Sequence, residues 1–171
     1  MSLSMYQASV PVFLRALHNL RDVLHKGEAH AIDKGYDPGV LLQTRLIPDM
    51  LPLVRQVQIA TDMAKGTAAR LAGEDPPRFE DNEASFAELK ARVARTVAFL
   101  QELQPTAFEG SEDRAITLKV GPPGNKRELN FVGLDYLLGF GTPNVYFHYS
   151  MAYALLRHNG LDIGKPDYVG A

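Results

Sequence analysis

Residues 53–72 read LVRQVQIATDMAKGTAARLA, and their apolar side chains recur with the period of an α-helix. The residues that share one face of this helix are Leu53, Val54, Val57, Ala60, Ala64, Ala68 and Leu71. Three of them are alanines in line, and such small side chains allow a second helix to approach closely. Gly73 and the prolines at 76–77 then end the helix, because proline cannot continue it. We therefore predict a long helix over about 52–72 that packs against other helices.

Three more segments show the same helical period. They cover about 6–26, with a further turn or two at 28–34, then 85–104 and 142–158. The third predicted helix begins at Ser85, which forms a capping box with Glu88. The last begins with Thr142 as its N-cap and Pro143 at its first helical position, a favoured pairing.

Between the third and fourth of these helices the period changes from 3.6 to 2. Ala115–Val120 and Arg127–Val132 both alternate, and residues 121–125 read as a turn, so we predict a two-stranded hairpin. Such a ribbon is marginal alone and must lie on the helices or on a partner. The fold class expected from these elements is all-α: a four-helix bundle with a small β-hairpin, in a single domain over residues 1–171.

Composition narrows the classes of function. The chain has 171 residues, a size that suits one domain. Its 18 Lys and Arg against 20 Asp and Glu argue against a nucleic-acid partner, because phosphate affinity needs surplus basic residues. It has no cysteine, which removes disulfides, thiolate nucleophiles and Cys-ligated metals. We find no secretion signal and no apolar run that could span a bilayer, so we expect a cytoplasmic protein with no membrane partner.

Histidines and carboxylates must therefore carry any site chemistry. His18 and His25 fall on the border of an apolar stripe and are expected to be solvated. His148 instead lies in an apolar sector, with Asn144 one turn earlier on the same face. Two interpretations stay open here. His148 is either a core histidine bonded to a side chain of another helix, or the remnant of a ligand pair at positions i and i+4.

Several motifs resemble an uncharacterised bacterial domain-of-unknown-function family of the DinB/YfiT-like superfamily. The matching segments are 49–58, 69–73, 79–83, 136–138, 143–148 and 152–160. The resemblance implies a DinB-like bundle with up-up-down-down connections and a long crossover, in which the hairpin lies between the third and fourth long helices. It also implies a homodimer, since members of the superfamily are usually dimeric.

The resemblance bears on metal binding too. Many members hold a divalent metal through three histidines, one on the second helix and two in a His-x-x-x-His pair on a later helix. Here His148 matches the second member of that pair, Asn144 stands at the first, and Gln58 or Asp62 occupies the region on the second helix. The three-histidine site therefore looks degenerate. We expect no metal and no cofactor, and any divalent metal that did bind would use His148.

These residues suggest a ligand pocket without a metal. The candidates for lining it are His148, Asn144, Gln58, Asp62 and Tyr153. Amide side chains donate and accept hydrogen bonds, so Asn144 and Gln58 could close a network around a neutral His148 or receive a small polar ligand. The expected function is a non-catalytic or small-ligand-binding homodimer, with catalytic residues unknown. The alternatives are a divergent metal-dependent enzyme of hydrolase or thiol-transferase type that uses His148, and a module that captures a partner on its hairpin edge.

Overall fold

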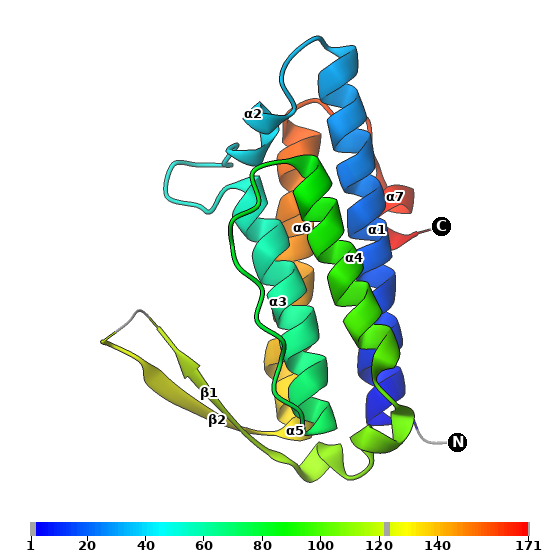
Figure 1. Ribbon diagram of the computed structural model, residues 1–171, viewed down its shortest axis with the longest axis vertical. Coiled ribbons are helices and arrows are strands. Elements are labelled where there is room, and N and C mark those ends of the chain that lie inside the picture. The colour runs from blue at the N-terminus through cyan, green and yellow to red at the C-terminus, as the bar shows by residue number, and fades with distance from the viewer. Residues whose placement is uncertain (1–2, 122–123, 171) are drawn as a thin grey trace.

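Four long helices pack side by side in the computed structural model, which describes residues 3–121 and 124–170 (Figure 1). They are α1 (Met5–Asp33), α3 (Leu53–Ala72), α4 (Phe86–Glu102) and α6 (Thr142–His158). The short elements are α2 (Gly39–Leu42), η1 (Pro105–Phe108), η2 (Ser111–Asp113), α5 (Gly133–Asp135), the π-helical η3 (Tyr136–Gly141) and α7 (Lys165–Val169). The prediction of a mostly helical chain with one small antiparallel hairpin is confirmed. Within the described residues, no helix has the length and apolar character needed to cross a membrane.

The first helix is longer than its sequence suggests. It runs without interruption past Gly27, where we predicted a weak point. A Cβ atom at Gly27 would lie 3.0 Å from Leu156 Cδ2 and 3.4 Å from Phe86 Cε1. The glycine therefore allows α6 and α4 to approach α1 closely, and this packing outweighs its low helix propensity.

The helices run up, down, down and up in chain order (Figure 1). The contacts agree for α1 and α6, since Gly27 near the end of α1 lies against Leu156 near the end of α6. This order differs from the expected up-up-down-down order. The difference comes from residues 73–85, which run back along the bundle so that α3 and α4 point the same way (Figure 1). Thirteen extended residues span roughly 40 Å, more than the length of about 30 Å of α3, so this crossover can return the full distance.

The hairpin consists of β1 (Ala115–Val120) and β2 (Arg127–Val132), and it extends outward from one end of the bundle (Figure 1). Its register pairs Ala115 with Val132 and Val120 with Arg127. Ile116 and Leu118 are buried and their neighbours on β1 are more exposed, as expected for a strand with one covered face.

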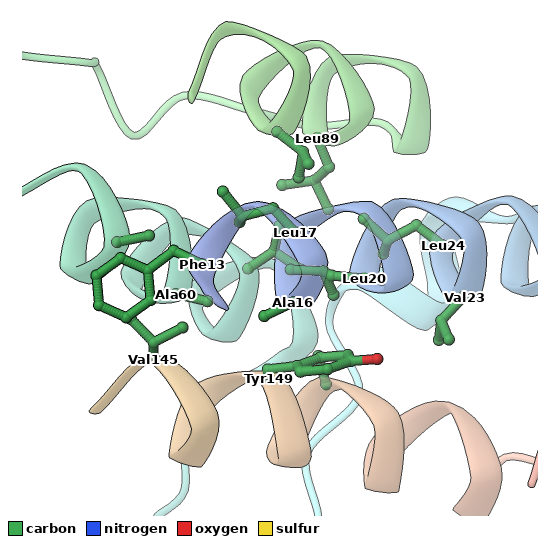
Figure 2. Close-up of a cluster of buried hydrophobic side chains, with 14 of the residues drawn as sticks. Phe13, Ala16, Leu17, Leu20, Val23, Leu24, Ala60, Leu89, Val145 and Tyr149 are labelled. Atoms are coloured by element: carbon green, nitrogen blue, oxygen red, sulfur yellow. The ribbon is translucent and has the colours of Figure 1, made fainter. Parts of the chain in front are cut away.

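The core forms where the apolar faces of the four long helices meet (Figure 2). It includes Phe13, Ala16, Leu17, Leu20 and Leu24 of α1, Ala60 of α3, Leu89 of α4, and Val145 and Tyr149 of α6. The small side chain of Ala60 faces this cluster, so the alanine stripe of α3 allows the close approach that its sequence predicted.

Candidate functional site

The most heavily bonded polar group of the bundle is the guanidinium of Arg92, on the face of α4 that meets α3 and the crossover. Arg92 is fully buried, with 0% of its surface exposed. All three of its nitrogens donate hydrogen bonds. Nε donates to Thr61 Oγ1 at 2.8 Å, Nη1 to the Glu80 carbonyl and Glu83 Oε1 at 3.0 Å, and Nη2 to Asp62 Oδ1 at 2.7 Å. Asp81 Oδ1 forms an ion pair with Nη2 at 3.0 Å.

These contacts also determine the charge state of Arg92. Burial by itself would lower its pKa, since a low dielectric disfavours the charged form. The hydrogen bond to Glu83 and the charges of Asp62 and Asp81 outweigh burial and raise the pKa above its ordinary value. Arg92 is therefore a permanent cation that ties the crossover to α3 and α4.

Other side chains extend this network to the surface. Gln58 Nε2 donates to Glu83 Oε2 at 2.8 Å, and Arg55 Nη1 donates to Gln58 Oε1 at 2.6 Å. Lys65 Nζ lies 2.9 Å from Asp62 Oδ1. The Phe79 ring of the crossover lies under three cations, with Lys65 Nζ 4.8 Å and Arg95 Cζ 4.7 Å from its centroid and Arg92 Cζ at 5.7 Å. Two of the predicted pocket residues, Gln58 and Asp62, thus belong to the Arg92 cluster.

His148 lies elsewhere, on the opposite side of α3. Its Nδ1 is 2.8 Å from Gln56 Oε1, and since an amide oxygen only accepts, the imidazole donates here. Gln56 in turn donates to the Leu51 carbonyl at 3.0 Å. Desolvation lowers the pKa of His148, so its neutral form is favoured.

The other two predicted pocket residues form hydrogen bonds with neither group. Asn144 Nδ2 donates to the Phe140 carbonyl at 2.7 Å, one turn back in its own helical segment. Tyr153 Oη donates to the Ile163 carbonyl at 3.3 Å, and its ring meets Tyr168 edge-on. Both side chains therefore make local contacts to neighbouring backbone.

The network expected among Asn144, His148 and Gln58 does not form within residues 3–121 and 124–170. The reason is helical geometry: positions 56 and 58 are about 200° apart around α3, so only one can face α6. Gln56 faces His148, whereas Gln58 faces Glu83 at the crossover.

Arg92 and Glu83 were missed by the sequence reasoning, although one signal was present. Arg92 falls on the apolar stripe of its helix, three residues after Leu89 and four before the buried Thr96. A charged residue inside such a stripe is almost never buried without a partner. Its partners Asp81 and Glu83, however, lie on the crossover, and no local sequence pattern encodes the path of that segment.

A cleft opens beside the Arg92 cluster, between α3, the crossover and the end of β1 that leads into the hairpin turn. One part, of about 310 Å³, lies against β1 and η3, and a second, of about 560 Å³, lies under residues 75–79. Asp62, Lys65, Arg70 and Pro76 line both parts. Of the predicted pocket residues, only Asp62 lines this cleft.

Comparison with known proteins agrees with this architecture. The family described as "Domain of unknown function (DUF1993)" matches residues 5–169. The chain is also similar to the crystal structure of a DinB family member protein from Shewanella denitrificans, with 37% sequence identity and a TM-score of 0.85. The match covers 98% of this chain and 92% of that one. A comparison with curated proteins gives no match. The predicted resemblance is therefore confirmed: the chain belongs to the DUF1993 family and is DinB-like in fold.

Proposed function

We propose that this protein is a non-catalytic, small-ligand-binding homodimer in which the metal site of the DinB-like superfamily is degenerate. The observation that carries the proposal is the surroundings of His148. Its side-chain partner is the amide of Gln56, and Asn144 is bonded to its own helical segment. Over the described residues, no three His, Cys, Asp or Glu side chains gather closely enough to hold a metal ion. Since an open catalytic zinc site takes three protein ligands, these residues do not fit the three-histidine centre.

The metal prediction is tested on protein purified without a metal-affinity tag. We expect elemental analysis to find no stoichiometric transition metal, and we expect Zn²⁺, Ni²⁺ and Mn²⁺ to leave the melting temperature unchanged. A metal at a hundred times its dissociation constant would stabilise the fold by about 2.7 kcal/mol, which a melting curve resolves. A stoichiometric metal that is lost in His148→Ala and kept in the exposed control His158→Ala would refute the proposal and favour a metalloenzyme that uses His148.

An exposed apolar surface around His148 supports the dimer. Phe147 is 54% exposed and its ring meets the His148 imidazole edge-on, with 5.1 Å between centroids. Leu51 is also exposed, and its backbone lies close to His148 because its carbonyl accepts a hydrogen bond from Gln56, the partner of His148. Large exposed apolar side chains that cluster commonly mark contact surfaces. We infer that the second copy covers this surface, which we call the Phe147 face.

Sedimentation tests the dimer. At micromolar concentration we expect the wild type to sediment as a dimer and Phe147→Asp as a monomer, because a buried carboxylate without a partner would cost the interface about 2 kcal/mol or more. Ile32→Asp, at an exposed position on α1, should remain dimeric. A monomeric wild type would contradict the homodimer, and a dimeric Phe147→Asp variant would place the contact elsewhere.

A further inference from the structure

The cleft between α3, the crossover and the hairpin has an unbalanced cation, Arg70. Its Nη1 donates to the Gly66 carbonyl at 2.8 Å and to Tyr136 Oη at 3.3 Å. Within residues 3–121 and 124–170, no carboxylate lies within salt-bridge distance of this half-buried guanidinium. Arginine presents its N–H groups in a planar fork that matches a carboxylate, and partial burial strengthens such pairing.

The other charges of the cleft offset one another. Lys65, whose side chain is 7% exposed, is 2.9 Å from Asp62, and Asp62 also accepts from Arg92. Asp75 and Arg78 are exposed charges of opposite sign at the rim. Lys119, which also lines the cleft, is exposed and lies 3.5 Å from Glu128 Oε1. Inside the cleft, one positive charge on Arg70 therefore remains unpaired, in a chain whose formal net charge is -2. A single residual charge matches a monoanion better than a phosphate, which carries nearly two negative charges at neutral pH.

An apolar wall lines the same part of the cleft. It is formed by Met63 of α3, Leu118 and Val120 of β1, and Phe140 of η3. The part of the cleft lined by these side chains has a volume of about 310 Å³, at the lower end of the range for small-molecule sites. A ligand that matches both Arg70 and this apolar wall has a carboxylate at one end and an apolar body at the other.

We propose that this cleft binds a small organic monocarboxylate, whose carboxylate pairs with Arg70 and whose apolar body lies against the apolar wall. This inference rests on the ligand-binding part of the proposed function and assigns it a site and a ligand class. The site uses neither His148 nor the Phe147 face, so it is independent of the metal and dimer predictions.

Isothermal titration calorimetry of the full chain tests the site, with hexanoate and phenylacetate as probes. We expect saturable binding of one probe per chain below about 10 mM, and no binding of neutral hexanamide. Arg70→Gln should weaken hexanoate binding roughly tenfold to a hundredfold, the usual effect of losing a charged hydrogen bond. Arg157→Gln, which changes an exposed arginine at the other end of the bundle, should bind as the wild type does.

A second variant covers the case in which Arg70→Gln fails to fold. Met63→Glu keeps Arg70 and places a negative charge in the apolar wall, so it should also abolish hexanoate binding. Equal binding by hexanoate and hexanamide, tighter binding of inorganic phosphate, or no carboxylate binding at about 10 mM would each overturn the inference. If hexanoate bound wild type and both variants alike, this site would be wrong while ligand binding itself would stand.

Discussion

Replacing Arg92 with methionine is expected to lower the free energy of unfolding by about 3–5 kcal/mol. Methionine roughly preserves the buried volume but removes the hydrogen bonds of the guanidinium and its ion pair with Asp81. Glu83, which is buried, then loses its closest cation and keeps only the Gln58 amide at 2.8 Å and the exposed Arg95 at 3.7 Å, so its buried charge is poorly compensated. Urea unfolding followed by circular dichroism measures the change, provided that the slope of the free energy of unfolding against urea concentration stays the same in both proteins.

The neighbouring arginine on α4 is the matched control. Arg95 also contacts the Phe79 ring and lies 3.7 Å from Glu83, but its side chain is 56% exposed. Arg95→Met should therefore cost no more than about 1 kcal/mol, the usual upper value for an exposed ion pair. Equal losses in the two variants would contradict the role assigned to Arg92.

A double variant separates the lost attraction from the charge left behind. In Arg92→Met with Glu83→Gln, the buried carboxylate becomes a neutral amide, and we expect part of the stability to return. Hydrogen exchange provides a local readout, because residues 73–85 are held to the bundle through Glu80, Asp81 and Glu83. Faster exchange confined to this segment in Arg92→Met would show that the arginine anchors the crossover.

Replacing Phe13 with alanine is expected to cost about 3–5 kcal/mol. The ring is fully buried, and it lies beside Ala60 and Val145, which come from two other helices (Figure 2). The residues around it come from rigid helices that can only partly close the cavity, so most of the lost contact energy is not recovered. Thermal and urea unfolding both measure this loss.

Phe99→Ala is the control for this change, because its ring on α4 packs against the core but is only half-buried. The same atoms are removed, yet solvent can fill the space, so the loss should be clearly smaller than for Phe13. Phe13→Leu should keep most of the stability, since a leucine fills much of the same volume. If Phe13→Ala cost less than Phe99→Ala, the core described here would be wrong.

Phe13 and Arg92 show how far the sequence alone could be used. The burial of Phe13 could be predicted, because it repeats with Val10, Leu17 and Leu20 at helical spacing, and that pattern depends only on local geometry. The two strands were found in the same way, from their alternation. The capping of α4 was predicted in part: Ser85 Oγ accepts from the Glu88 amide at 3.2 Å, but the Glu88 carboxylate reaches the Ala84 amide instead of that of Ser85.

The partners of the site residues could be predicted less well from the sequence. His148 was singled out because it stands in an apolar sector, but its partner was expected at Gln58 and is Gln56. A shift of two residues turns a side chain by about 200° around a helix, and the facing direction of α3 depends on how α6 packs against it. The ion pairs of Arg92 and the cleft beside Arg70 join segments far apart in the chain, which periodicity does not relate.

The sequence by itself determined the four long helices, the hairpin and the apolar residues of the core, because each follows from a local period and from the removal of apolar surface from water. The predicted N-cap at Thr142 is wrong, since η3 leads directly into α6 and no side-chain cap forms there. Only the tertiary structure decided that α3 and α4 run in the same direction. It also decided the path of residues 73–85 and the partners of Arg92, His148 and Arg70. The physical reason is that hydrophobic burial is non-directional, whereas a hydrogen bond or an ion pair depends on distances and angles that exist only after the helices have packed.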